Sequence, residues 1–377
     1  MPYDKKLDLA GPGISTYEKV AEVLPENYDP ILSRKDTQKA IALIKMKMEE
    51  GLCKRLNLFR IECPLILEKA SGMNDYLDRD GSRTPVDFPA GLGLEKRIEA
   101  QVVQAATKWK RFALRQFECG MHEGIYTDMR AVRKDYFLDH DHSSYVDQWD
   151  WERVIDPGTD RTIPFLKETV RALWATFVEA DAAVRREFRP LAEKLAPIPK
   201  ELVFLHAEEI LAKYPTLPRK ERETRIVQEI PGVFIIGIGA TLRDGYPHEM
   251  RAADYDDWCT PTIQGPDGEQ YHGLNGDILM WNPVTKRRHE LSSMGIRVTK
   301  ETLVQQLKET NQEHFLQLPY HKMILADEIP QSIGGGIGQS RTYQYLLGKA
   351  ALGECSVTIW PHQLHEACAA KGIHLLR

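Results

Sequence analysis

The sequence predicts a mixed α and β fold, because helix-like and strand-like patterns both occur and neither covers the whole chain. Segments with helical periodicity lie mostly before residue 230, and short β-rich runs bounded by glycine or proline lie after it. The chain has no internal repeat, and 377 residues suffice for one large core or two modest ones. A hydrophobic fraction of 42% and a charged fraction of 28% are ordinary for a soluble globular enzyme.

Four segments are predicted to be helical. The first, residues 36–51, opens with an aspartate that can cap a helix and closes on a glycine. The second, residues 165–195, is long and strongly periodic, and Pro190 is expected to break or kink it. Two further helices are predicted over residues 201–214 and 217–230.

Three runs after these helices are predicted to be strands. Residues 232–239, 277–281 and 356–360 are short, rich in β-branched and aromatic side chains, and bounded by Gly or Pro. An earlier segment, residues 145–152, also fits a strand, with Gln148, Asp150 and Glu152 on one face and two tryptophans on the other. The tryptophan face is expected to be packed. The polar face meets either solvent, as in an ordinary amphipathic strand, or a cation or a ligand's ammonium.

A glycine run at residues 334–338, followed closely by Arg341, is the most informative stretch of the sequence. Glycines allow a close approach of backbone to a ligand, and arginine offers a planar, permanent cation to phosphate. The run matches neither the P-loop nor the G-x-G-x-x-G pattern. Taken alone, it is better explained as a flexible loop before a helix, since many glycine runs bind nothing.

Net charge and cysteine content exclude several classes of protein. A net charge of −5 argues against a protein whose main task is to hold nucleic acid. The six cysteines are widely spaced without a C-x-x-C pair, so neither a zinc site nor a disulfide framework is indicated. The first thirty residues contain no apolar run long enough for a signal peptide, and no stretch of the sequence reaches the length of a membrane span. We therefore expect a cytoplasmic protein with reduced cysteines.

Two charged clusters are predicted to be solvent-exposed rather than functional. Residues 219–225 are rich in arginine and fit a solvated helix face better than a phosphate-binding surface. Residues 139–142, Asp-His-Asp-His, look like a metal-binding cluster but are expected to form a solvated loop. By contrast, Asp277 and Glu290 lie in or beside strand-like runs, and carboxylates with little else around them suit Mg²⁺.

Several blocks together closely resemble the ammonia-dependent aspartate–ammonia ligases, the single-chain asparagine synthetases. The blocks are KWKR at 108–111, an arginine after a strand at 133, YVDQWDWER at 145–153, DYDDW at 254–258, GLNGDILMWNP at 273–283, ELSSMGIR at 290–297 and GGGIGQSR at 334–341. The similarity runs from about residue 36 to residue 361. That family is in turn similar to the catalytic domains of class II aminoacyl-tRNA synthetases, especially the aspartyl enzyme.

The resemblance implies a fold, an assembly and a reaction. The fold would be α+β, with an antiparallel β-sheet flanked by helices, and the assembly a homodimer. Residues 1–30 would form an N-terminal extension to a single catalytic domain over residues 31–377. Aspartate and ATP would give β-aspartyl-AMP and pyrophosphate, and ammonia would then displace AMP to leave asparagine. Membrane and nucleic acid are not expected as partners.

The resemblance also implies roles for residues that contact ATP. Arg133 would meet the α-phosphate and Arg341 the terminal phosphates. Asp277 and Glu290 would organise Mg²⁺ and ATP. The remaining residues expected at the nucleotide are Ser292, Gly336 and Gly338, the glycines letting backbone pass close under the adenine and ribose.

For aspartate, the resemblance implies that Lys110 meets the side-chain carboxylate, Arg297 the α-carboxylate, and Gln148 with Asp150 the α-ammonium. Ser293 and Asp256 are also expected at the substrate. Ammonia is mostly ammonium at neutral pH, so a carboxylate should bind it and accept its proton. Asp75 is the favoured candidate, and Asp256 is the other.

The chain departs from the family pattern in two places. Residues 104–107 are Gln-Ala-Ala-Thr where bacterial members carry a His-Ser pair, and residues 134–136 are Lys-Asp-Tyr rather than a Pro-Asp-Glu-type run. Other functions remain as alternatives: a tRNA-charging enzyme, although no segment looks like an anticodon-binding barrel, and a non-catalytic amino-acid or nucleotide sensor. A glutamine-dependent synthetase is disfavoured, because the chain begins Met-Pro and has no cysteine-nucleophile domain.

Overall fold

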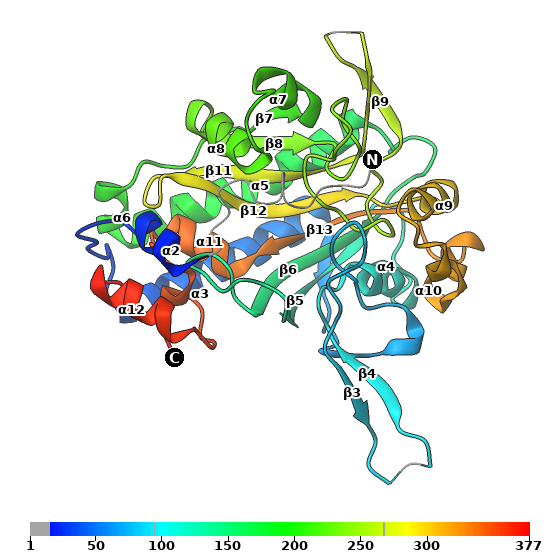
Figure 1. The fold of residues 1–377 in the computed structure, drawn as a ribbon, viewed down its shortest axis with the longest axis horizontal. Coiled ribbons are helices and arrows are strands. Elements are labelled where there is room, and N and C mark those ends of the chain that lie inside the picture. Colours follow the sequence, from blue (N-terminus) through cyan, green and yellow to red (C-terminus); the bar gives the residue numbers. More distant parts are fainter. Residues whose placement is uncertain (1–15, 94, 267) are drawn as a thin grey trace.

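A sheet of eight strands forms the centre of the molecule, in the order β1-β5-β6-β13-β12-β11-β8-β7 (Figure 1). The structure is a computed structural model that describes residues 16–93, 95–266 and 268–377. The strands are β1 (Leu58–Arg60), β5 (Gly124–Val132), β6 (Tyr145–Val154), β7 (Val203–His206), β8 (Gly232–Ile236), β11 (Asn275–Asn282), β12 (Arg287–Ile296) and β13 (Ser332–Gly338).

The predicted antiparallel sheet is confirmed, and the structure adds a parallel strand at each edge. Strands β5, β6, β13, β12, β11 and β8 pair antiparallel in that order. At the edges β1 pairs with β5 and β7 with β8, both in parallel. Parallel neighbours need a long crossover connection, and helices α7 (Ala207–Lys213) and α8 (Arg219–Glu229) supply it between β7 and β8.

Two long helices, α3 (Arg34–Leu56) and α5 (Ile163–Glu187), pack together over one face of the sheet (Figure 1). They bury apolar side chains against Trp149 and Trp151 of β6, so the tryptophan face of that strand is packed as predicted. The N-cap of α3 is Ser33, whose hydroxyl accepts the Asp36 N–H at 3.1 Å, rather than Asp36 itself. The opposite face of β6 contacts helix α4 (Thr107–Gln116).

The predicted break in the helix over residues 165–195 is confirmed, because α5 ends before Phe188 and Pro190 occupies the first turn of the following helix α6 (Arg189–Lys194), where its missing N–H costs nothing. Two other predicted elements need correction. The first part of the predicted helix 201–214 is strand β7, and α7 begins only after the N-cap His206. Residues 356–360 form no strand, because the described part of the sheet places no neighbour beside them.

Smaller elements surround the central sheet. Strands β2 (Ile66–Glu68), β4 (Ile98–Val102) and β3 (Asp87–Ala90) make a three-stranded sheet, and β3 and β4 extend from the body as an arm (Figure 1). The others are α2 (Tyr17–Val23), α9 (Lys300–Glu309), α10 (Pro319–Leu325), α11 (Gln339–Leu346), α12 (His362–Ala370), β9 (Pro261–Gln264), β10 (Gln270–His272) and the short 3₁₀ helices η1 (Lys69–Ser71), η2 (Glu313–Gln317) and η3 (Leu352–Glu354).

The N-terminal part of the described chain packs on the C-terminal part. Helix α2 shares a small apolar cluster with α12, and the Tyr28 hydroxyl donates to Glu354 Oε2 at 3.0 Å. The division into an extension over residues 1–30 and a domain over 31–377 stays a prediction, and its first fifteen residues lie outside the described ones. Among the helices of the described chain, none combines the length and the apolar composition that a bilayer crossing requires.

Candidate active site

A cavity of about 520 Å³ opens over the face of the sheet that lies opposite α3 and α5. Strands β6, β11, β12 and β13 form its floor, and the loops around residues 133–143 and 249–256 form its walls. All the predicted site residues except Asp75 line it. They are Lys110, Arg133, Gln148, Asp150, Asp256, Asp277, Glu290, Ser292, Ser293, Arg297, Gly336, Gly338 and Arg341.

The glycine run is an inner strand of the sheet, so its interpretation as a flexible loop is wrong. Strand β13 pairs with β6 on one side and β12 on the other. None of its glycines has a positive φ, so they are not needed for an unusual backbone conformation. Gly334 and Gly336 are needed because a side chain would not fit. A Cβ at Gly334 would overlap the Glu152 carboxylate and lie 2.6 Å from an Arg297 nitrogen, and one at Gly336 would lie 3.1 Å from Gln148 and Asp150 oxygens. Bare backbone under the cavity leaves room for these side chains.

Gln148 and Asp150 share the cavity face of β6, as the strand periodicity predicts, and Lys110 of α4 contacts Asp150. The Lys110 ammonium donates to Asp150 Oδ1 at 2.6 Å and to the Gly335 carbonyl at 2.7 Å, and both side chains are buried. The second oxygen of Asp150, Oδ2, is buried and has no hydrogen-bond partner. Lys110, expected to meet a substrate carboxylate, is therefore already paired with a protein carboxylate.

Arg297 at the end of β12 is held by two carboxylates. Its guanidinium makes a bidentate pair with Glu152, at 2.9 and 2.8 Å, and also pairs with Asp256. Burial opposes the charged form of Arg297, but the two carboxylates outweigh it and raise the pKa further above its usual value. The sequence did not single out Glu152 as a functional residue, although the strand pattern placed it on the same face as Asp150.

Asp277, Glu290 and Ser293 face the cavity together because of a β-bulge. The register between β11 and β12 shifts at Leu291, so Glu290 and Ser293 come to the same side of β12, and the Ser293 hydroxyl donates to Glu290 at 3.2 Å. Asp277 lies directly opposite Ser293. Arg251, which the sequence analysis missed, donates to Asp277 Oδ1. It lies three residues before the DYDDW block, and this proximity was the only signal that could have found it.

The two carboxylates of this group differ in acidity. Burial raises the pKa of Asp277 to about 7, with Glu290 and Glu249 adding to the effect and Arg251 opposing it. Burial also disfavours the Glu290 carboxylate, but Arg341, Lys220 and Arg288 outweigh it and lower the pKa of Glu290. Two adjacent carboxylates that face a cavity supply the oxygen donors that Mg²⁺ prefers, so these residues fit the predicted metal pair.

Arg341 and Arg133 contribute cations with few internal partners. Arg341, in the first turn of α11, lies 3.4 Å from the Glu290 carbonyl and 4.0 Å from its carboxylate. Arg133, just after β5, donates from Nε to the Gln104 carbonyl at 3.1 Å. The Ser292 hydroxyl donates to the Gly336 carbonyl at 3.1 Å, which ties β12 to β13 beneath Arg341.

Asp75 lies behind the cavity wall and is fully buried. Its Oδ2 accepts the Thr107 N–H at 2.8 Å, whereas Oδ1 is buried without a hydrogen-bond partner. Burial raises the pKa of Asp75 to about 7, with Lys108 opposing and Asp254 adding to the shift. Lys108 itself donates to Asp254 at 2.9 Å, beside His321. Sequence analysis placed Lys108 in the basic block but did not connect it to Asp75.

The two clusters expected to be solvated are substantially buried, and those predictions are wrong. In α8, Arg219, Arg222 and Glu223 are at most 5% exposed. Glu223 forms an ion pair with Arg288, with 2.7 Å between Glu223 Oε2 and Arg288 Nε. In the loop at 139–142, Asp139 and His140 are 4% and 3% exposed. Both clusters are buried by elements distant in the sequence, which local charge patterns do not report.

Comparison with known proteins assigns the chain to a family. The aspartate–ammonia ligase family matches over residues 35–372. The chain belongs to the aspartate–ammonia ligase family. An aspartate–ammonia ligase from Clostridium perfringens strain SM101 is 42% identical over 353 residues, which cover 94% of this chain and 98% of the relative. Aspartate–ammonia ligases from Levilactobacillus brevis and Bacillus mycoides are also 42% identical, over 94% and 92% of this chain and 99% of each relative. The prediction of an enzyme, a ligase, is thereby confirmed.

Solved structures show the same fold at low sequence identity. Asparaginyl-tRNA synthetase from Pyrococcus horikoshii, complexed with asparaginyl-adenylate, aligns with a TM-score of 0.62 at 12% identity, over 87% of this chain and 70% of that one. The asparaginyl-tRNA synthetase of Entamoeba histolytica aligns with a TM-score of 0.61, also at 12% identity, over 86% of this chain and 67% of that one. This member of the aspartate–ammonia ligase family therefore has the predicted class II synthetase-like fold.

Proposed function

We propose that this chain makes L-asparagine from L-aspartate and ammonia, with ATP activating the side-chain carboxylate as β-aspartyl-AMP. The observation that carries the proposal is the single cavity over β13, in which cations suited to phosphate adjoin buried carboxylates suited to an ammonium group. Membership of the aspartate–ammonia ligase family supports the choice of aspartate and ammonia as substrates.

The first step would join aspartate to the nucleotide. An oxygen of the aspartate side chain attacks the α-phosphorus of ATP, the bond to the β-phosphate breaks, and pyrophosphate leaves. Such a reaction asks the protein mainly for positioning and charge stabilisation. Arg133 would contact the α-phosphate and Arg341 the terminal phosphates, while Ser292, Gly336 and Gly338 would lie along the nucleoside.

Asp277 and Glu290 would hold Mg²⁺, which fits their oxygen donors and would neutralise charge on the phosphates when bound. The pKa of Asp277, about 7, is consistent with a carboxylate that would be held fully ionised by a nearby cation. Arg251 would keep the Asp277 side chain in place through its hydrogen bond.

Aspartate would be oriented by the residues on the cavity floor. Its α-ammonium would lie between Gln148 and the unpartnered oxygen of Asp150, and Arg297 would receive its α-carboxylate. Lys110 would meet the side-chain carboxylate that is activated. Ser293 and Asp256 would complete the pocket around the substrate.

The second step would transfer nitrogen. Ammonia attacks the side-chain carbonyl carbon of β-aspartyl-AMP, the bond to the phosphate oxygen breaks, and AMP leaves. Ammonium must first lose a proton, and a carboxylate with a pKa near 7 can accept it at neutral pH. Asp75, with its raised pKa and unpartnered oxygen, is the residue we assign to this task, in preference to Asp256, whose oxygens face Arg297 and Arg251.

The reaction is tested by incubating the purified protein with aspartate, ammonium chloride and Mg-ATP. Asparagine, AMP and pyrophosphate are expected in equal amounts. Formation of ADP would contradict the adenylate mechanism, and charging of tRNA with aspartate would favour a synthetase. The homodimer and the cytoplasmic location are part of the same proposal and are tested separately.

A further inference from the structure

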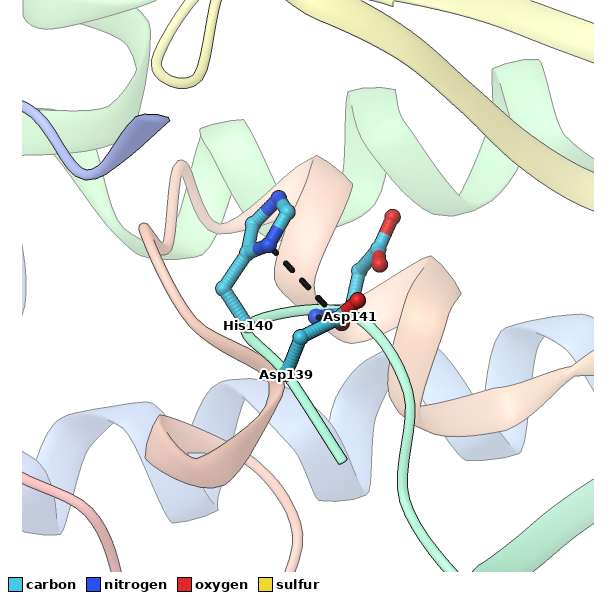
Figure 2. Close-up of side chains that lie close together, drawn as sticks. All are labelled: Asp139, His140 and Asp141. Atoms are coloured by element: carbon cyan, nitrogen blue, oxygen red, sulfur yellow. Dashed lines mark hydrogen bonds and ion pairs between the residues drawn. The ribbon is translucent and has the colours of Figure 1, made fainter. Parts of the chain in front are cut away.

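We propose that Asp139, His140 and Asp141 form a binding site for a divalent transition-metal ion, separate from the Asp277–Glu290 pair. The three side chains lie close together in the loop between β5 and β6 (Figure 2). They line the same cavity as Arg341. One possible ligand atom from each lies within 4.8 Å of the other two. The loop therefore brings two carboxylates and an imidazole together in a small volume.

The imidazole of His140 supplies an independent sign of a missing ligand. His140 is 3% exposed, and its Nδ1 is buried without a hydrogen-bond partner. This nitrogen lies 3.8 Å from Asp139 Oδ1, which is too far for a hydrogen bond. The separation suits a shared ion, because two bonds of about 2.1 Å to one metal can span roughly that distance.

The loop is held in shape by hydrogen bonds with its own backbone and with the segment after α11. Asp139 Oδ1 accepts the backbone N–H groups of Asp141 and His142, each at 2.9 Å. The His140 carbonyl accepts the Leu352 N–H at 2.7 Å, which anchors the loop to the segment after α11. Asp141 is partly exposed, so the cluster is accessible from the cavity.

His142 gives the cluster an alternative, purely structural explanation. Its Nδ1 lies 2.7 Å from Asp141 Oδ1 and 3.1 Å from Asp139 Oδ1, so a protonated imidazole can balance the two acids without any metal. That pairing leaves the Nδ1 of His140 without a partner, whereas a metal ion would satisfy both it and the carboxylates. The experiment below separates the two explanations.

The donor set indicates the class of metal. Two carboxylates with one imidazole suit Mn²⁺, Fe²⁺, Co²⁺ or Zn²⁺, whereas Mg²⁺ and Ca²⁺ prefer oxygen alone. Three protein ligands leave coordination positions for water or for phosphate oxygens. On the proposed function, the terminal phosphates lie near Arg341, so the open positions would face the leaving pyrophosphate.

The site is tested by titrating substrate-free protein with Mn²⁺ and counting free ions by electron paramagnetic resonance. A D277N/E290Q double variant should retain one Mn²⁺ site. Adding H140N or D141N to that background should weaken this site at least tenfold, while D135N, an exposed acid of the same loop, should not. Circular dichroism confirms that each variant is folded. Unchanged Mn²⁺ affinity in both H140N and D141N would overturn the proposal.

A second measurement tests whether the open coordination positions of the ion face the phosphates. Pyrophosphate added to the Mn²⁺-loaded D277N/E290Q variant should show coupling between the metal electron spin and ³¹P. An absence of coupling under saturating pyrophosphate would overturn the placement beside the phosphates. Because both measurements use no aspartate or ammonia, they can fail or succeed independently of asparagine synthesis.

Discussion

At the scale of single residues, the site depends on carboxylates whose surroundings differ sharply. Asp75 is buried with one oxygen unpartnered, and its pKa rises to about 7. Glu152 is equally buried, yet Arg297 outweighs the effect of burial and lowers its pKa. The same side-chain chemistry thus gives a proton acceptor at one position and a permanent anion at the other.

Asp75→Asn should remove the acceptor for the ammonium proton. Wild-type asparagine formation should rise with pH through about 7 as Asp75 ionises. The variant should lose that rise and on the order of a hundredfold in kcat, a typical size for general-base catalysis. The measurement is the pH profile of kcat from 5.5 to 9. A variant with an unchanged profile would remove Asp75 from this role.

Asp75→Asn should lower activity but raise the stability of the fold at neutral and alkaline pH. An aspartate whose pKa is raised from 3.8 to about 7 favours folding only while protonated, so its contribution is lost as pH rises towards 7. Asp75→Asn is neutral at every pH, and we expect it to be more stable than wild type above pH 7. Thermal unfolding at pH 5 and pH 8 measures the difference, with Asp135→Asn, an exposed acid, as the control.

Arg341→Ala should nearly abolish turnover while leaving the fold intact. Among the described residues, the polar contacts of the Arg341 guanidinium are long ones to Glu290, at 3.4 and 4.0 Å, so little folding energy depends on it. Loss of one electrostatic stabiliser of a transition state typically costs a hundredfold or more in rate. Arg341→Lys keeps the positive charge but lacks the planar guanidinium, so its turnover should lie between those of the wild type and Arg341→Ala. Pyrophosphate release and thermal unfolding are measured together; a large drop in stability would contradict the assignment.

At the scale of elements, β13 shows why glycines occupy an inner strand. The missing side chains leave room for neighbouring residues, and a Cβ atom added at each position would be less crowded towards the end of the strand. Gly334 faces the Glu152 and Arg297 pair, Gly336 faces Gln148 and Asp150, and a Cβ at Gly338 would have its nearest contact at 3.4 Å. The strand is thus a floor whose shape is set by the side chains above it.

Gly334→Ala should destabilise the protein more than Gly338→Ala. The first methyl group would push apart the buried Glu152 and Arg297 pair, and overpacking of this kind costs about 1–3 kcal/mol. The second would meet only ordinary contacts with Arg341. Urea unfolding of the two variants gives the comparison. Equal stabilities would show that the strand can shift to make room.

The sequence predicts which residues line the cavity better than it predicts the elements and burial around the cavity. Thirteen of the cavity's residues follow from the motif blocks, and the alternation along β6 correctly separates Asp150 from the tryptophans. Only the first part of the predicted helix over residues 201–214 is wrong, because a short apolar run such as Val203–His206 fits a strand as well as a helix turn. The loop that holds Asp139 and His140 is hydrogen-bonded to Leu352, more than two hundred residues away, and no local pattern contains such a contact.

At the scale of the whole molecule, one edge of the sheet carries exposed apolar surface. Strand β1 is the last strand of the sheet, and its Phe59 is 37% exposed, while Met46 on the neighbouring helix α3 is 45% exposed. A shallow hollow beside them is lined by Met46, Cys53 and Tyr126. These features suit the homodimer that the family resemblance implies.

Met46→Glu should raise the fraction of monomer if α3 lies in that dimer interface, because a charge would have to be buried on association. Light scattering after size exclusion measures the mass at several concentrations. Leu92→Glu is the matched control, since Leu92 is 90% exposed at the tip of the β3–β4 arm. A wild-type monomer, or equal effects of both substitutions, would contradict the placement.

The pairing of Lys110 with Asp150 has a consequence for which molecules can enter. Before any ligand arrives, both cations of the proposed substrate pocket are already paired, since Lys110 faces Asp150 and Arg297 faces Glu152 and Asp256. Binding is then an exchange of partners, in which a guest must offer a carboxylate to the cation and an ammonium to the anion at once. Succinate or a simple amine offers only one of these groups, so its binding would leave a buried charged side chain without a partner. On the proposed function, the pocket would thereby select for zwitterions before any chemistry begins.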